Sequence, residues 1–144
     1  MTKQDVFGNL KIAVKEKALK YTKQRELILE TIYNSKNHLN AEQIHKKLTI
    51  SNKDDKVGIA TVYRNLLFLE KTGLILSISL NNNLKQYEIN QHKHHDHLVC
   101  MRCGKIVEFI NQNIEQEQET IAKEFKFKLL SHTMHLYGVC ENCQ

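Results

Sequence analysis

The chain has 144 residues, of which 41% are hydrophobic and 26% are charged, with a formal net charge of +5, a composition typical of a folded globular protein. It has no apolar run near the ~20 residues that a membrane helix needs, and its first residues lack the basic and apolar pattern of a signal peptide. We therefore expect a cytoplasmic protein with no membrane partner, whose four cysteines stay reduced.

Apolar residues at helical spacing predict three helices in the first part of the chain. The first covers residues 5–18. Thr22 is the predicted N-cap of the second helix, which ends near Asn34. Asn40 is expected to cap the third helix, with Gln43 at the position of a reciprocal capping contact.

A fourth helix is predicted after the polar stretch 51–56, beginning near Gly58 and stopped by Gly73. Four of its apolar residues recur at helical spacing and should face the other helices. They are Ile59, Val62, Leu66 and Leu69. The residues expected to point away from the core are Thr61, Arg64 and Asn65. Tyr63 lies between the two faces, and a partly buried core position is its alternative.

Two alternating segments, residues 74–80 and 84–89, predict a β-hairpin whose turn is Asn81-Asn82-Asn83. Helices followed by a hairpin are typical of a winged helix-turn-helix domain, whose last helix enters the DNA major groove. The charge distribution also favours DNA binding by the first half, because residues 1–73 carry a net charge of +6 and residues 74–144 a net charge of −1. A small helical domain without a DNA role is the alternative.

The second half of the chain has a mixed pattern. Strands are predicted at 97–101 and 106–110, then a helix at 112–125 with Ile114, Ile121 and Phe125 on its apolar side. Residues 128–139 alternate again. We therefore predict an α+β protein.

Its expected organisation is a DNA-binding domain over residues 1–89, a hinge over 90–93 and a ligand-rich α/β domain over 94–144.

All four cysteines fall in two CxxC pairs, Cys100/Cys103 and Cys140/Cys143, separated by 36 residues. Four thiolates at this spacing are the ligand set of a closed tetrahedral zinc site. A pair of disulfides in a secreted protein is the alternative reading of the same spacing.

Four of the eight histidines lie in the segment from His92 to His97. In an extended chain His95 and His97 share one face, whereas His94 and Asp96 share the other. The segment can therefore give two ligands to each of two sites. Imidazole with carboxylate suits Fe(II), Zn(II), Mn(II) or Co(II). A solvated polyhistidine loop is the alternative.

An enzyme with a catalytic zinc is the main rival function, because such a site also uses a few His, Cys or carboxylate ligands. The sequence contains no HExxH and no HxE ahead of PCxxC, and its five glycines are isolated. We expect neither catalysis nor a small-molecule substrate.

Four ordered motifs extend across nearly the entire chain. They are YTKQR at 21–25, GIATVYRNL at 58–66, HHDHLVCMRCGK at 94–105 and HLYGVC at 135–140. Together they resemble the Fur family of metal-dependent transcription regulators. The resemblance implies an N-terminal winged-helix domain and a C-terminal α/β dimerisation domain that acts as a homodimer or a higher oligomer.

Three metal sites are implied by this resemblance. The structural zinc site would use Cys100, Cys103, Cys140 and Cys143. A regulatory site would use His38, Glu88, His95 and His97, with Glu108 as a fifth ligand. A further site would use His94, Asp96, Glu115 and His132. One regulatory metal would then cross-link the two domains and bias their relative orientation.

The implied function is regulation of transcription, mainly repression, in iron uptake and homeostasis, with Fe(II) as co-repressor. Mn(II), Co(II) or Zn(II) are expected substitutes. Peroxide sensors of the family tend to have aspartates where this chain has Glu88 and Glu108, which favours an iron-uptake regulator. Zinc and nickel regulators are the remaining alternatives, because these ligand types accept several metals.

Operator DNA is the implied partner. The resemblance assigns DNA contacts to Lys20, Tyr63 and Arg64, and the helical wheel adds Thr61. The chain departs from the family pattern in two respects. Its helix before Lys20 is longer than in the shortest members, and Lys23 stands where a proline is common.

Overall fold

A computed structural model describes residues 2–51, 57–80, 84–91 and 94–144. The chain divides into two compact units, Met1–His92 and Lys93–Gln144. Three predicted features fall wholly or partly outside the described residues: most of the polar stretch 51–56, the hairpin turn at 81–83, and the hinge residues His92 and Lys93. None of the helices within the described ranges is both long and apolar enough to cross a membrane.

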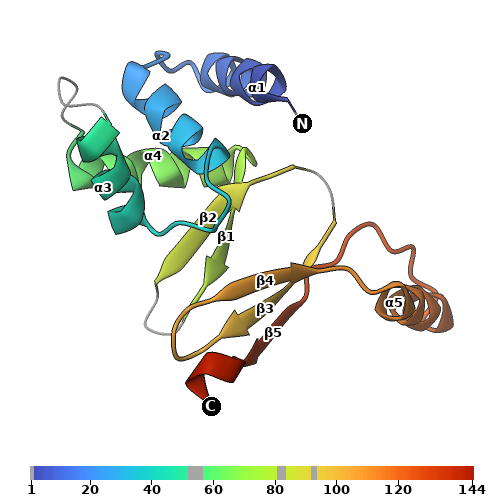
Figure 1. Cartoon of the computed structure of the whole chain (residues 1–144). Helices are drawn as coiled ribbons and strands as arrows, with labels where there is room; N and C mark the ends of the chain where they lie inside the picture. Colours follow the sequence, from blue (N-terminus) through green and yellow to red (C-terminus); the bar gives the residue numbers. More distant parts are fainter. Residues whose placement is uncertain (1, 52–56, 81–83, 92–93) are drawn as a thin grey trace. The chain divides into compact units, whose positions relative to one another are not determined.

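The first unit contains four helices and a hairpin (Figure 1). They are α1 (Lys3–Glu16), α2 (Lys23–Tyr33), α3 (Ala41–Ser51), α4 (Ile59–Lys71), β1 (Ile75–Ser79) and β2 (Lys85–Ile89). The winged-helix order predicted from the sequence is therefore present.

The predicted helix caps are confirmed. The Thr22 side chain accepts a hydrogen bond from the backbone N–H of Arg25. Asn40 and Gln43 form the reciprocal pair, each side-chain oxygen accepting from the other's backbone N–H at 2.8 and 2.9 Å. Helix α1 begins two residues earlier than predicted, because Thr2 and Asp5 form a capping box of their own.

The core of this unit draws a fully buried side chain from every helix and from β1. These include Leu10, Ile28, Ile44, Leu66 and Ile75. Burial of one such side chain stabilises the fold by roughly 1.5–3 kcal/mol. The core therefore holds the surface residues of α3 and α4 in set positions.

Two predictions for α4 are wrong. Ile59, the first residue of the helix, is 38% exposed, whereas Val62 one turn later is fully buried. Asn65 is only 6% exposed and its amide donates to the backbone carbonyl of Thr61 at 2.8 Å. Asn65 lies three residues after Val62 and four before Leu69, which places it on the buried side of the helix.

The hairpin of β1 and β2 is antiparallel, with Leu76 opposite Glu88. An isolated bridge joins Leu39, in the loop between α2 and α3, to Tyr87 of β2, with N–O distances of 3.1 and 2.8 Å. This bridge attaches the α2–α3 loop to the hairpin and brings the residues next to Leu39 and Tyr87 together.

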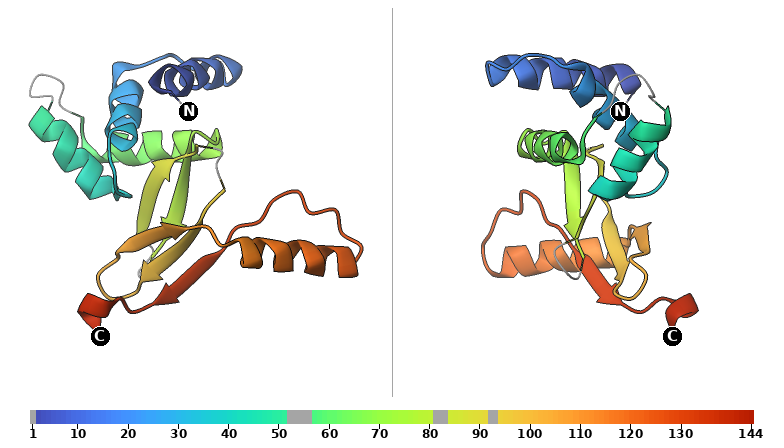
Figure 2. Two further views of the ribbon diagram at one scale, coloured as in Figure 1. Left: turned by 45° about the vertical axis from the view of Figure 1, so that its right-hand side comes forward. Right: turned by 90° about the vertical axis from the view of Figure 1, so that its left-hand side faces the viewer.

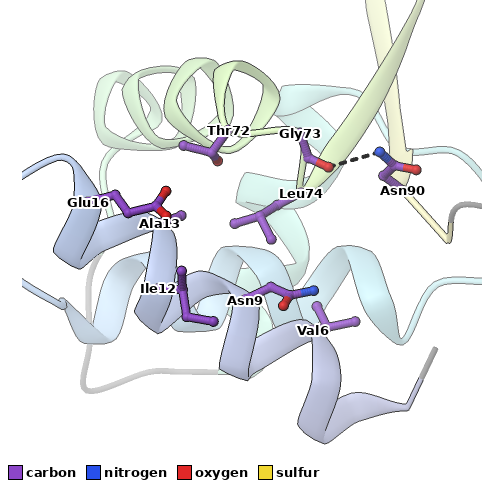
Figure 3. A pocket seen from close by; sticks show the side chains of 9 residues that line it. All are labelled: Val6, Asn9, Ile12, Ala13, Glu16, Thr72, Gly73, Leu74 and Asn90. Atoms are coloured by element: carbon purple, nitrogen blue, oxygen red, sulfur yellow. Dashed lines mark hydrogen bonds between the residues drawn. The ribbon is translucent and has the colours of Figure 1, made fainter.

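A pocket of about 240 Å³ lies between α1 and the turn from α4 into β1 (Figure 3). Asn90 borders it, and the Asn90 amide donates to the carbonyl of Gly73 at 2.9 Å. The Asn90 backbone N–H also donates to Leu74 at 3.1 Å. The first residue of the predicted hinge is thus hydrogen-bonded to the α4–β1 turn.

The second unit contains a small sheet and one long helix (Figure 2). Its elements are β3 (Asp96–Cys100), β4 (Ile106–Phe109), α5 (Gln112–Glu124), β5 (His135–Gly138) and the short 3₁₀ helix η2 (Glu141–Cys143). The sheet order is β4-β3-β5, with β4 antiparallel and β5 parallel to β3. The α+β class is confirmed.

Two details differ from the sequence prediction. Only His135–Gly138 of the alternating segment 128–139 forms a strand, because only these residues pair with β3. The apolar side of α5 is present, but none of its residues is buried, and Ile121 and Phe125 are both exposed. An alternating or amphipathic pattern predicts which face is apolar, but it does not say what covers that face.

Candidate metal centres and nucleic-acid interface

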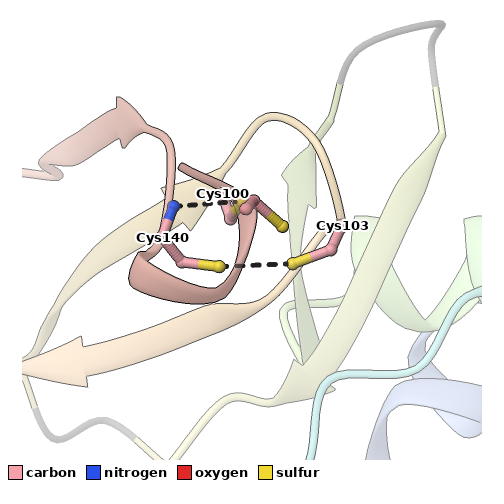
Figure 4. A group of neighbouring side chains, drawn as sticks. Cys100, Cys103 and Cys140 are labelled. Atoms are coloured by element: carbon pink, nitrogen blue, oxygen red, sulfur yellow. Dashed lines mark hydrogen bonds between the residues drawn. The ribbon is translucent and has the colours of Figure 1, made fainter.

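The four cysteines converge in the second unit, where the loop after β3 faces the segment that ends in η2. Figure 4 shows three of them, Cys100, Cys103 and Cys140. Their sulfur atoms all lie within 4.8 Å of one another. The Cys103 and Cys140 sulfurs are 3.7 Å apart, too far for a disulfide bond of about 2.05 Å. Around a zinc ion with ~2.3 Å Zn–S bonds, the edge of a tetrahedron is ~3.8 Å. The spacing fits zinc and does not fit the disulfide alternative.

The thiols of this cluster differ in acidity. The backbone N–H of Cys140 donates to the Cys100 sulfur at 3.3 Å, and this contact, with others from Cys103, lowers the pKa of Cys100 to about 6. Hydrogen bonding with Cys140 and Cys103 raises the pKa of Cys143 to about 12. Thiolates are the form that binds zinc, so zinc binding to this cluster is coupled to the release of protons.

A second cluster lies at the start of β3 and comprises His94, Asp96, Glu115 and His132. His94 Nε2 is 3.0 Å from Glu115 Oε1 and 3.4 Å from Asp96 Oδ1. His132 Nε2 is 3.5 Å from the same Glu115 oxygen. The strand alternation predicted that His94 and Asp96 share a face, and this geometry confirms it.

Asp96 tests whether this cluster suits a cation. Its side chain is 0% exposed, and neither carboxylate oxygen makes a hydrogen bond to any of the described residues. A buried carboxylate without hydrogen bonds is unfavourable by several kcal/mol in order of magnitude. Asp96, Glu115 and the imidazoles of His94 and His132 together form a donor set that suits a divalent cation.

His38 and Glu88 form a pair within the first unit. His38 Nε2 lies 3.4 Å from Glu88 Oε2. His38 precedes Leu39 and Glu88 follows Tyr87, so the bridge between Leu39 and Tyr87 is what brings these two side chains together. The pair places an imidazole nitrogen and a carboxylate oxygen, both metal-ligand types, next to each other in the first unit.

His97 is the centre of a corresponding group in the second unit. It lies opposite Glu108 of β4 and opposite His135 of β5, so the three side chains share one face of the sheet. The His95 and His97 rings are 4.7 Å apart, and the His97 and His135 rings 5.3 Å. The proximity of His135 to His97 could not be predicted from the sequence, because the parallel pairing of β5 with β3 has no local sequence pattern.

Helix α4 exposes some of the side chains that were expected to contact DNA. Arg64 is exposed, and its guanidinium donates to the Thr61 hydroxyl at 3.3 Å. Tyr63 is 47% exposed, so its alternative as a core residue is wrong. Lys20 lies on another segment, the exposed turn between α1 and α2.

Comparisons with known proteins agree with this arrangement. The model of the ferric uptake regulator family matches residues 16–137. The ferric uptake regulation protein of Campylobacter upsaliensis is 47% identical over 130 residues, which cover 90% of this chain and 83% of that protein.

Solved structures of ferric uptake regulators also resemble this chain. The Helicobacter pylori ferric uptake regulator Fur, described as having three functional metal-binding sites, matches with a TM-score of 0.90 at 36% identity and covers 99% of this chain and 94% of that one. The Francisella tularensis ferric uptake regulator with iron matches with a TM-score of 0.77 at 35% identity, covering 87% and 94% respectively.

Proposed function

This chain belongs to the ferric uptake regulator family, and on that premise we propose that it is a metal-responsive, DNA-binding transcriptional regulator of iron uptake and homeostasis, acting mainly as a repressor. Relatives that are themselves ferric uptake regulators, one of them solved with iron, support this function and support Fe(II) as co-repressor. A protein that regulates chromosomal operators acts in the compartment that holds the DNA.

The proposed regulatory site takes His38 and Glu88 from the first unit and His95, His97 and Glu108 from the second. When bound, Fe(II) supplies a divalent charge that imidazole and carboxylate donors can share. Ligation from both units would restrict their relative orientation, and a ligand that favours one orientation shifts the equilibrium toward it. The pairing of His38 with Glu88 at 3.4 Å is the observation that best supports this site, because it unites two ligands 50 residues apart.

The other two sites have separate proposed roles. The four cysteines would hold a structural zinc, since their sulfur spacing suits a closed tetrahedral site. The cluster of His94, Asp96, Glu115 and His132 would hold a further metal that stabilises the second unit. Mn(II), Co(II) and Zn(II) are expected to substitute at the histidine and carboxylate sites.

A homodimer bound to double-stranded operator DNA is the proposed working form. The apolar side of α5 is exposed in the single chain, and Phe127 and Leu130 after it are exposed as well. Apolar surface of this kind is typical of a protein–protein interface. Helix α4, with Thr61, Tyr63 and Arg64, is proposed to read the operator, with Lys20 as a further contact.

Metal-dependent operator binding by two neighbouring histidine variants tests the regulatory site. We expect His95→Ala to remain folded and zinc-loaded, but to lose the Fe(II)- or Mn(II)-stimulated increase in operator affinity. His94→Ala, on the opposite face of the strand, is the matched control and should have the smaller effect. Affinity is measured by fluorescence anisotropy with each metal buffered at a fixed free concentration.

Full metal stimulation in both His95→Ala and His38→Ala would contradict the assignment of the regulatory ligands. If the wild-type protein binds no operator with any divalent metal, the proposed regulatory function itself fails.

A further inference from the structure

Tyr63 of α4 is hydrogen-bonded to a neighbouring helix although it is largely exposed. Its hydroxyl donates to Glu42 Oε1 at 2.6 Å. Glu42 lies in the first turn of α3, 21 residues earlier in the sequence. The hydrogen bond therefore links the two helices of the helix-turn-helix on their solvent side.

The contact is a hydrogen bond to an ionised acceptor. The bond from Tyr63 lowers the pKa of Glu42, and the bond to Glu42 raises the pKa of Tyr63. Glu42 is thus a carboxylate at neutral pH, and hydrogen bonds to charged acceptors are shorter and stronger than neutral ones. The bond restricts the rotation of an exposed aromatic side chain before any DNA arrives.

A carboxylate on this surface is otherwise unfavourable for DNA binding. Phosphates repel it, and removal of one negative charge should strengthen binding to any duplex. Glu42 is also separate from the cap of α3, since Asn40 and Gln43 make that contact. Interaction with the helix dipole in the first turn of α3 is the purely structural role that remains.

We propose that Glu42 is a positioning residue for Tyr63: it holds the ring in the orientation that contacts base edges and so raises selectivity for the operator over random DNA. This inference rests on the proposed function, in which α4 reads the operator. An ordered side chain loses less entropy on binding, and this gain is realised only where Tyr63 makes its specific contact.

Three variants separate the effect of the Tyr63–Glu42 hydrogen bond from the effect of the negative charge of Glu42. Glu42→Gln keeps an acceptor for the Tyr63 hydroxyl and removes the charge. Glu42→Ala removes both the acceptor and the charge. Tyr63→Phe keeps the ring and removes the donor. Glu16→Gln, an exposed carboxylate of α1, is the control for loss of one negative charge from the same unit.

The experiment measures the affinity of the metal-loaded full-length protein for two duplexes. One is selected from a random pool by the wild-type protein, and the other is an unselected duplex of equal length. Glu42→Gln should bind both more tightly by the same factor and keep the wild-type selectivity ratio. Glu42→Ala and Tyr63→Phe should each lower that ratio roughly 3- to 10-fold, the range expected for ordering one side chain. The double variant should lower it no further.

Several results would overturn the proposal. Wild-type selectivity in Glu42→Ala or in Tyr63→Phe would do so, as would an additive loss in the double variant. A loss in Glu42→Gln as large as in Glu42→Ala would show that charge, and not the hydrogen bond, is responsible. The thermal unfolding of each variant shows that it is folded. Failure of the wild-type protein to enrich any duplex would instead refute the proposed function.

Discussion

Asp96 is the residue whose surroundings most clearly favour a bound cation. Its carboxylate is fully buried, with His94 and His132 nitrogens 3.4 and 3.9 Å from one oxygen. Contacts at these distances, without hydrogen bonds to the carboxylate, leave most of its desolvation penalty in place. The free energy of unfolding should therefore depend on this residue in opposite directions with and without metal.

We predict that Asp96→Asn stabilises the metal-depleted protein by about 1–3 kcal/mol, because it removes a buried charge. The same change should abolish the extra stability that added Zn(II) or Mn(II) gives. Urea unfolding followed by circular dichroism, with and without metal, measures both effects. Glu117→Gln, an exposed carboxylate of α5, should change neither value. Destabilisation of the metal-depleted protein by Asp96→Asn would contradict the prediction.

Cys140 gives a second prediction at the level of one residue. Its sulfur lies 3.7 Å from that of Cys103, and its backbone N–H contacts Cys100. Cys140→Ser should reduce bound zinc from one per chain to near zero and destabilise the second unit, since binding at such sites contributes directly to folding. Zinc is measured by chelator release after gel filtration. His132→Ala should retain this zinc, and tight zinc retention in Cys140→Ser would refute the assignment.

The elements of the first unit are joined by a polar network at Glu70. This α4 carboxylate accepts from the Ser77 hydroxyl of β1 and from the Lys85 ammonium of β2 at 2.9 and 3.0 Å. Burial acts to raise the pKa of Glu70, but the hydrogen bonds from Ser77 and Lys85 outweigh it and lower the pKa. The network connects α4 to both strands of the hairpin.

The contribution of Glu70 to the free energy of unfolding should decrease as the pH falls. A folded-state pKa below the unfolded value of about 4.3 means that the contribution is complete above that pH and is lost as pH falls through the folded pKa. We predict that Glu70→Gln costs about 1–2 kcal/mol at pH 7, and that the difference from wild type shrinks in acid. Urea midpoints from pH 7 to pH 3 measure it. An equal difference at every pH would argue against the network.

At the scale of the whole molecule, the exposed apolar side of α5 supports the proposed association of the chain with a second copy. Beyond residue 93, the buried residues in the described part of the chain are Asp96, His97, Val99 and Cys100. Ile121 and Phe125 on α5 are exposed, and Leu130 is 86% exposed. Such surface on a small unit is expected to be covered by a second copy of the chain.

We predict that Ile121→Glu converts the proposed homodimer to a monomer, because a charge would be buried in an apolar interface. The fold of the single chain should persist, since Ile121 is exposed there. Thr120→Glu, on the neighbouring exposed position, should remain dimeric. Sedimentation equilibrium gives the mass of each variant. A dimer of unchanged stability in Ile121→Glu would remove α5 from the interface.

Features that depend on residues close together in the chain could be predicted from the sequence alone. The caps at Thr22 and Asn40 were predictable because a cap depends on residues only three positions apart. The division of His94 and Asp96 from His95 and His97 followed from the two-residue period of a strand. The spacing of the two CxxC pairs likewise predicted the four-sulfur cluster.

Other features were decided only by tertiary structure. The His38–Glu88 pair depends on the bridge between Leu39 and Tyr87, and the Tyr63–Glu42 bond depends on how α3 packs against α4. The same packing buries Asn65, which helical spacing had predicted to point away from the core. The sequence therefore determined which side chains could bind metal or DNA. Their grouping depends on contacts between residues far apart in the chain, and no local period describes such contacts.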